Sequence, residues 1–440
     1  MHKKSLLFKT VSFAALGLGL FAVSGFCETA PLKADAGFKS AVVSTGSDMG
    51  RKEKMTLVSP GQKSVHRRLQ KQSDVQKQTT PESFDKIYSD FKKSLNDAIG
   101  LSYTFDVSVL GQRGAPNGKG TAWQTQYYGS ANWDMYSSRF GSGSLQAAYT
   151  YVHYWGKSAE RIGNNIGVVN DINDYSSNAY YFDQLSYTHQ FDGVMKPLSV
   201  TIGQFPMYTF DGSEYDANQQ INFINYALSQ NGSSSYPSAG LGGFITLTPN
   251  DQFSFTVGMQ DANNISGSKI QTSTLHRKQF TSFASVSYTP TIKGLGSGQY
   301  SVMIYNQPWT IEQPDTSNGW SFNLSQDLND KLTVFGRING SRGNVETIKQ
   351  SYVLGGVVNN PFERNALDQI GFAAAVNKIN KEVAGGNPRS VETVLEGYLS
   401  VGVSNYLILT PDVQFYINPA SDKDNSHTAT VVSMRATLMF

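Results

Sequence analysis

A polar and aromatic stretch at residues 206–239 carries the side chains best suited to contacting a solute. It holds the carboxylates Asp211, Glu214 and Asp216, and it contains no lysine or arginine. Its first aromatic rings, set among asparagine and glutamine side chains, are Tyr208, Phe210 and Tyr215. Ring faces stack on the C–H faces of sugars, and carboxylates and amides exchange hydrogen bonds with hydroxyl groups. The stretch predicts a sugar-contacting loop; the alternative is a surface loop whose rings pack beneath it.

Charged side chains also occur inside segments that alternate apolar and polar residues. The candidates are Asp106, Asp134, Arg337, Glu396, Asp412 and Arg435. A charge in hydrocarbon costs about 2–4 kcal/mol near the bilayer midplane, so each is expected on the wet face of its segment. There the charges either tune which solutes pass or form ion pairs that brace the wall.

The sequence offers little for catalysis. It has no nucleophile–base–acid spacing, no cluster of metal ligands and no phosphate-binding loop, and its six histidines are scattered. We therefore predict neither an enzyme nor a metal or cofactor site, and we expect no nucleic-acid partner.

The elements that would position these residues are β-strands. The closing segment 428–440 places Val432, Met434, Ala436, Leu438 and Phe440 on one face and polar residues on the other. The same alternation recurs from residue 101 onward and predicts an all-β, transmembrane antiparallel barrel of about 16 strands. The predicted strands are 101–113, 122–135, 143–155, 179–191, 197–205, 240–249, 252–261, 278–290, 299–308, 319–327, 331–340, 352–358, 367–377, 393–404, 406–417 and 428–440.

Connection lengths and composition support a membrane barrel over a soluble one. Long connections such as 156–178 and 206–239 alternate with short ones such as 250–251 and 328–330, which is the pattern of outer loops and periplasmic turns. Charged residues make up only 16% of the chain, against roughly 25% in soluble domains. The five tryptophans fall near predicted strand ends, where an interfacial girdle would place them.

The N-terminal hundred residues precede the predicted barrel. Residues 1–24 have the basic start, short apolar run and small residues of a secretory signal peptide. Residues 25–80 form a basic, flexible periplasmic arm, either a plain linker or a contact to peptidoglycan. Residues 81–99 predict an amphipathic helix, packed near the barrel mouth or, alternatively, lying at the membrane interface.

The C-terminal third carries a pattern that resembles a known family. Its parts are LDQIGFA at 367–373, VETVLEGY at 391–398 and LTPDVQFYINP at 409–419. They resemble the carbohydrate-selective outer-membrane porin family (OprB type), over about residues 80–440. The resemblance implies passive diffusion of sugars through a sixteen-stranded barrel with a narrowed throat. Family throats are arginine-lined, but the motif places no such arginines here, and the acid-rich loop 206–239 departs from that pattern.

Three functional hypotheses follow. The first is a porin in the outer membrane of a Gram-negative bacterium that passes sugars or similar small hydrophilic solutes. The second is a cation-preferring general porin. The third is a structural or adhesive barrel plugged by helix 81–99. Outer-membrane lipid is an expected partner, and Phe440 is the expected signal for the barrel assembly machinery, as the family resemblance implies.

Overall fold

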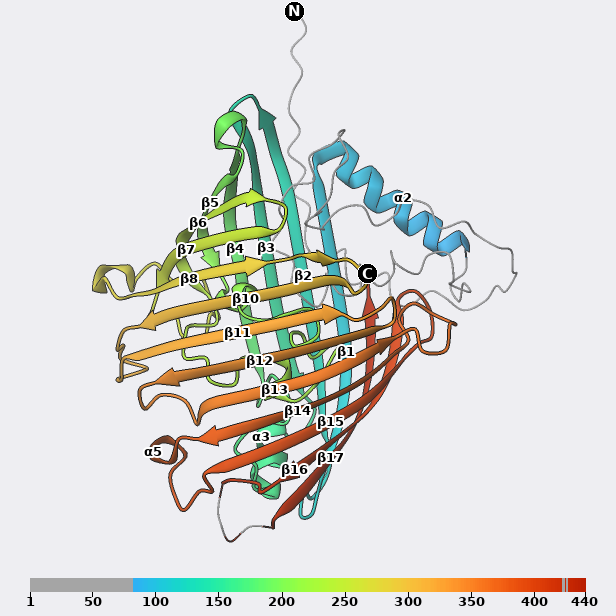
Figure 1. Cartoon of the computed structure of the whole chain (residues 1–440), viewed down its shortest axis with the longest axis vertical. Helices are drawn as coiled ribbons and strands as arrows, with labels where there is room; N and C mark the ends of the chain where they lie inside the picture. Colours follow the sequence, from blue (N-terminus) through green and yellow to red (C-terminus); the bar gives the residue numbers. More distant parts are fainter. Residues whose placement is uncertain (1–81, 422–423, 425) are drawn as a thin grey trace, which may run out of the picture.

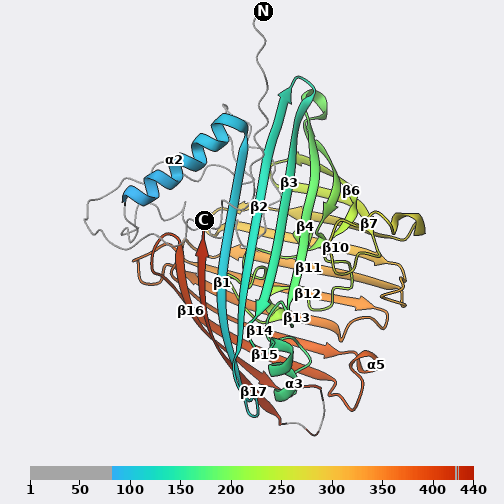
Figure 2. The ribbon, with the colours of Figure 1, turned by 180° about the vertical axis from the view of Figure 1, so that it is seen from behind.

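One antiparallel wall of sixteen strands closes on itself in the computed structural model, which describes residues 82–421, 424 and 426–440 (Figure 1 and Figure 2). The wall strands are β1 (Leu101–Ala115), β2 (Ala122–Ser138), β3 (Gly141–Tyr154), β4 (Ala179–Phe191), β5 (Leu198–Phe205), β6 (Gly240–Asn250), β7 (Phe253–Asp261), β8 (Phe280–Tyr288), β10 (Gly296–Gln307), β11 (Ser317–Asp327), β12 (Leu332–Arg342), β13 (Ile348–Asn359), β14 (Gln369–Ile379), β15 (Val391–Gly402), β16 (Leu407–Ile417) and β17 (Thr428–Met439). The two-residue β9 (Thr291–Ile292) pairs with the start of β10 within a turn. The predicted fold class and strand set are confirmed, with ends that differ by a few residues.

Closure depends on the first and last strands. β1 pairs with β2 on one side and with β17 on the other, in a ladder that runs from Asp106 opposite Met439 to Ala115 opposite Thr430. Beyond this ladder, Phe105 and Phe440 exchange two main-chain hydrogen bonds. Since every wall strand has two neighbours, the sheet has no free edge, as a bilayer requires.

The alternation in sequence sorts the side chains to two faces. On β7, Phe255, Val257 and Met259 are exposed, whereas Thr256 and Gln260 are buried. On β17, Val432 and Met434 are exposed and Arg435 is buried. The exposed apolar faces form the lipid-facing surface, and all five tryptophans are exposed.

Long and short connections alternate along the chain as expected, with one difference. The β12–β13 hairpin, expected to have a long loop at 341–351, turns within 343–347, because its ladder continues through Gly340 opposite Gln350. Short helices occur only within connections among the described residues: α3 (Ala159–Ile166), η2 (Gly193–Met195), η3 (Met207–Phe210), α4 (Tyr226–Ser229), η4 (Leu275–Arg277) and α5 (Lys381–Ala384).

Helix α2 (Glu82–Ile99) precedes β1 and contacts β1 and β2 at the end of the barrel where the C-terminus lies (Figure 1 and Figure 2). Gly100 makes the turn between helix and strand with φ of +73°, and a side chain there would meet the carbonyl oxygen of Asp134 at 2.5 Å. No described helix is long and apolar enough to cross a membrane. The expected signal peptide (1–24) and basic arm (25–80) lie outside the described residues.

The main apolar core lies inside the barrel. Ile162 and Ile166 of α3, with Val168 and Ile172, pack against Phe223 and other side chains of loop 206–239 and against inward-facing wall residues. Two outer connections therefore fold into the lumen and fill part of it. This packing positions the candidate site.

Candidate functional site

Loop 206–239 crosses the interior from one wall to another. At one side the amide nitrogen of Gln220 donates to the hydroxyl of Ser108 on β1 over 3.2 Å. At the other side Asn323 on β11 donates to the Asp211 carboxylate over 3.3 Å. β1 and β11 are not neighbours in the sheet, so the loop narrows the passage between them.

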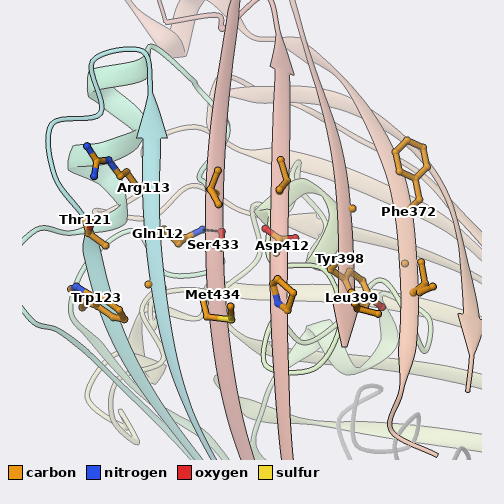
Figure 3. Close-up of a pocket in the computed structure, with 17 residues that line it drawn as sticks. Gln112, Arg113, Thr121, Trp123, Phe372, Tyr398, Leu399, Asp412, Ser433 and Met434 are labelled. Carbon is orange, nitrogen blue, oxygen red and sulfur yellow. Dashed lines mark hydrogen bonds between the residues drawn. The ribbon is translucent and has the colours of Figure 1, made fainter. Parts of the chain in front are cut away.

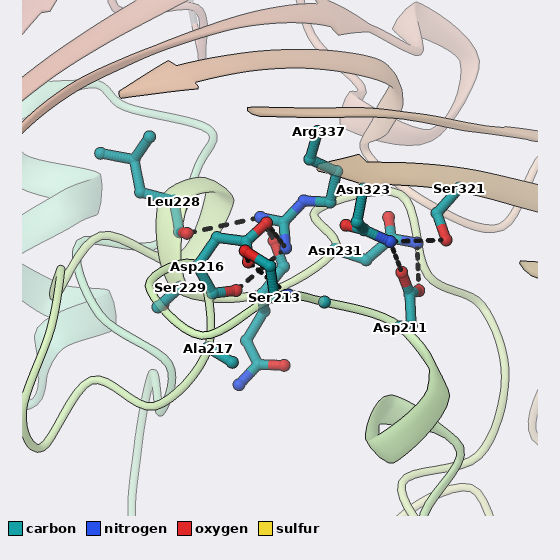
Figure 4. Close-up of polar contacts among 12 residues, drawn as sticks. Asp211, Ser213, Asp216, Ala217, Leu228, Ser229, Asn231, Ser321, Asn323 and Arg337 are labelled. Carbon is teal, nitrogen blue, oxygen red and sulfur yellow. Dashed lines mark hydrogen bonds and ion pairs between the residues drawn. The ribbon is translucent and has the colours of Figure 1, made fainter. Parts of the chain in front are cut away.

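Two buried arginines hold the main chain of this loop. Arg337 on β12 donates to the carbonyl oxygens of Ala227 (2.9 Å) and Asp216 (3.1 Å), and its guanidinium lies 3.4 Å from the Asp216 carboxylate (Figure 4). Arg435 on β17 donates to the carbonyl of Asn222 over 2.8 Å and also to that of Gln219. A planar guanidinium with five donors suits such multiple carbonyl contacts.

Two glutamates on β15 hold main-chain amides in the same way. Glu396 accepts from the N–H groups of Ile224 (2.5 Å) and Asn225 (2.9 Å) in loop 206–239. Glu392 accepts from the N–H groups of Val169 and Asn170, each over 2.9 Å, in loop 156–178. The wall thus clamps both inner loops through charge-assisted hydrogen bonds.

A further predicted wall charge, Asp412, lies beside the clamping side chains. Asp412 on β16 interacts with Glu396 on one side and with Arg435 on the other. Of the six predicted wall charges, Asp134 is half-buried and the other five are buried, and Arg337, Glu396 and Arg435 brace loop 206–239. Their effect on selectivity stays a prediction.

The three loop carboxylates are inside the barrel but buried. Asp211 accepts from Asn231 (2.7 Å) and Tyr236 (2.9 Å), and Asp216 accepts from the N–H of Ser213 over 2.5 Å. Glu214 is also buried. These carboxylates fix the shape of the loop, and their contact with a solute stays a prediction.

The predicted loop aromatics divide into two kinds. The Phe210 ring packs 5.1 Å from Phe244 and 5.0 Å from Phe283, and buried Tyr215 accepts from the Asn359 side chain over 3.0 Å. Tyr208 is only half-buried. Packing beneath the loop thus accounts for Phe210 and Tyr215, and contact of Tyr208 with a solute stays a prediction.

The sequence reasoning missed three carboxylates that are half-buried, not fully buried. Asp171, Asp174 and Glu346 are half-buried in outer connections. Their partly dry surroundings raise the pKa of Asp171 to about 6 and the pKa values of Asp174 and Glu346 to about 7. Only their sequence position in loops was visible, and that alone does not show which loops fold inward.

Two further tyrosines lie near these acids. The rings of Tyr175 and Tyr181 are 5.7 Å apart and half-buried, and both lie close to Asp183. Rings beside carboxylates can stack on sugar faces or attract cations. In the described ranges, no group of three His, Cys, Asp or Glu side chains is arranged to hold a metal ion.

A groove of about 730 Å³ crosses the outer surface of the wall, not the lumen (Figure 3). It spans strands β14–β17, β1 and β2 and is bordered by exposed apolar side chains such as Trp123, Phe372 and Met434. Gly111 and Gly397 line the groove and have no side chains to fill it. The groove faces lipid and is not the solute passage.

Comparisons with known proteins agree with this architecture. The model of the "Carbohydrate-selective porin, OprB family" matches residues 280–440. A porin named AaxA from Chlamydia abortus is 37% identical over 360 residues, which is 80% of each chain. Porin AaxA from Chlamydia trachomatis serovar L2 is 40% identical over 316 residues, 72% of this chain and 68% of that one.

A solved structure shows the same fold. The OprB structure from Pseudomonas putida matches with a TM-score of 0.67 at 16% identity, over 80% of this chain and 97% of that chain. The sequence identity to the AaxA porins and the fold shared with OprB lead to the same assignment. The chain belongs to the carbohydrate-selective porin (OprB) family and is an outer-membrane porin.

Proposed function

We propose that this porin passes sugars and similar small hydrophilic solutes by passive diffusion, and that it favours neutral and cationic solutes over anions. The sugar class is the one printed for the family, and the charge preference comes from the interior of this chain. The carrying observation is the imbalance between buried acids and buried bases. Among the described residues, the buried basic side chains are Arg337 and Arg435, and the buried acidic ones are Asp106, Asp183, Asp211, Glu214, Asp216, Asp261, Asp327, Asp368, Glu392, Glu396 and Asp412.

The two arginines are poorly placed to attract an anion. Both guanidinium groups are buried and directed at loop carbonyls. Three half-buried side chains of the outer connections, Asp171, Asp174 and Glu346, are acidic, and two, Lys157 and Arg389, are basic. In a narrow, low-dielectric passage, fixed charges of one sign raise the local concentration of the opposite sign. The interior therefore supports cation preference.

Three half-buried tyrosines support the passage of sugars. Tyr175, Tyr181 and Tyr208 present half-buried rings near the carboxylate of Asp183. A hexose can stack on such a ring while its hydroxyls bond to nearby polar groups. Stacking of this kind is weak enough to release the solute, which a diffusion channel requires.

Planar bilayers and liposome swelling test the proposal together. In a salt gradient the reversal potential should have the sign of cation preference, and swelling should be faster with neutral sugars than with sugar phosphates of similar size. A variant with Asp174→Asn and Glu346→Gln should move the reversal potential towards zero. The matched control is Asp330→Asn, which alters an exposed turn carboxylate.

Each opposite result is informative. An anion-preferring reversal potential would contradict the charge preference. Faster swelling with anionic sugars would contradict it independently. A folded, heat-modifiable barrel that conducts no ions would favour a plugged barrel. The plug would then be the outer loops that fill part of the lumen, because α2 contacts β1 and β2 at the barrel end.

A further inference from the structure

Helix α2 packs against outward-facing residues at the seam of the barrel. The Tyr88 ring lies 5.8 Å from the Tyr406 ring and 6.0 Å from the Phe440 ring, and Lys92 lies 5.0 Å from the Tyr103 ring centre. Tyr103 shares the face of the lipid-facing Phe105, and Phe440 pairs with Phe105. The helix therefore lies at the end of the wall, next to β1 and the C-terminus, as Figure 2 shows.

The exposed part of α2 carries an apolar stripe. Ile87 is 70% exposed, Phe91 is 55% exposed and Ile99 is 54% exposed. At 3.6 residues per turn, positions 87, 91 and 99 lie within one third of the circumference. Counted round the helix from Ile87, Phe91 lies at about 40°, whereas Ile99 at about 120° falls between the barrel contacts Tyr88 and Lys92, at about 100° and 140°. The part of the stripe that points away from the barrel is therefore Ile87 and Phe91.

The other exposed arc of the helix is charged. Lys86, Asp90, Lys93 and Asp97 are exposed and lie on the side away from Tyr88 and Lys92. One face of α2 thus contacts the barrel, a second face is apolar and exposed, and a third face is charged. A helix with adjacent apolar and charged faces is suited to the boundary between lipid and water.

The stripe is continuous with the lipid-facing surface. Trp133 is exposed on the outer face of β2, and its indole N–H donates to the carbonyl oxygen of Ile99 over 2.9 Å. Exposed Met135, Tyr136 and Phe140 extend this surface along the end of β2 and its turn. The Tyr136 hydroxyl lies 2.5 Å from that of Tyr187, which extends the aromatic band to β4. Bands of this composition lie at bilayer interfaces.

We propose that α2 lies in the periplasmic leaflet of the outer membrane, at the level of the phospholipid headgroups. Ile87, Phe91 and Ile99 insert among the acyl chains, and Lys86 and Lys93 lie beside the phosphates. Amphipathic helices of this type bury their apolar face about 5–10 Å into the headgroup boundary. Phospholipid is the occupant because the stripe continues a surface that already faces lipid.

Site-directed labelling of the full chain tests the placement. In a Cys27→Ser background, an environment-sensitive fluorophore is attached to Ile87→Cys or Phe91→Cys and, as matched controls on the charged arc, to Asp90→Cys or Lys93→Cys. Each variant is refolded into phosphatidylcholine vesicles whose acyl chains carry bromine near the headgroup. The labels at 87 and 91 should be quenched several-fold more strongly than those at 90 and 93, and should resist aqueous iodide. Equal iodide quenching at all four positions overturns the proposal.

Two measurements separate lipid from protein occupants. If a second copy covers the stripe, Ile87→Cys chains form disulfide-linked dimers under oxidation, and bromine quenching is lost; this overturns the proposal. The double variant Ile87→Asn/Phe91→Asn should remain heat-modifiable, because the wall is unchanged, and a label at Ile99→Cys in that background should gain iodide access. Unchanged iodide access there also overturns the proposal. Ion conduction is not the readout, so this test and the test of the proposed function can fail independently.

Discussion

Buried charges in this porin act on the main chain of the inner loops. Arg337 and Arg435 bind loop carbonyls, and Glu396 binds loop amides. A charged group in a partly dry interior must be compensated, and carbonyl and amide dipoles from a loop provide that compensation. The wall and the loop therefore stabilise each other, and the loop keeps one position in the lumen.

Arg337→Ala should release loop 206–239. The change leaves the Asp216 carboxylate buried beside the vacated space, and breaking a buried pair of this kind costs about 3–5 kcal/mol. Single-channel recordings should show higher conductance and frequent flickering, while the barrel stays heat-modifiable. Arg342→Ala, at the exposed end of the same strand, is the matched control. Quiet steps of unchanged size would contradict the clamp.

At the scale of elements, the seam between β1 and β17 determines whether the barrel closes. The ladder ends at Phe440, whose main chain pairs with Phe105 and whose ring contacts Tyr88 of α2 and Tyr406 of the β15–β16 turn. The terminal residue therefore joins four elements at one point. Its recognition by the barrel assembly machinery is a prediction from family resemblance.

Deletion of Phe440 should lower the amount of assembled porin in the outer membrane. We expect the chain still to cross the inner membrane, because the deletion leaves the predicted signal peptide (1–24) unchanged. Heat-modifiability of isolated outer membranes measures the folded fraction. Phe440→Tyr should retain most assembly because it keeps the aromatic ring contacts. Equal amounts of folded barrel for the deletion and the unaltered chain would contradict the role of the terminal ring.

At the scale of the molecule, the interior is narrow and acidic. Loops 156–178 and 206–239 share an apolar core with the inner wall, so only part of the lumen is left for solutes. Carboxylates from several elements act on this remaining space, and their summed field sets the charge preference. Removal of one of them shifts the preference by less than removal of several.

Cation preference should weaken as the pH falls from 8 to 5. Burial raises the pKa values of Asp174 and Glu346 to about 7 and of Asp171 to about 6, so these carboxyls become neutral as the pH drops through that window. Reversal potentials across this range should show a midpoint between pH 6 and 7. Asp174→Asn with Glu346→Gln should reduce the change. A midpoint near pH 4 would instead indicate ordinary exposed carboxyls, whose pKa values are about 4.

The wall of the barrel can be predicted from the sequence pattern. A period of two, a bilayer that excludes unpaired main-chain groups and loops that alternate in length together identify sixteen strands and the facing of each side chain. The buried position of Arg337 and the exposed face of Val432 and Met434 followed from parity alone. Local pattern suffices here because lipid on one face and polar lumen on the other act on each residue separately.

The shape and lining of the solute passage are visible only in the folded structure. No periodicity shows that loop 206–239 folds inward, that Asp211 and Asp216 bond within the protein, or that Asp174 and Glu346 are half-buried. These placements depend on contacts between residues more than a hundred positions apart, such as Arg337 with Asp216 and Glu396 with Ile224. Such contacts form only when the closed wall brings distant strands around the same loop.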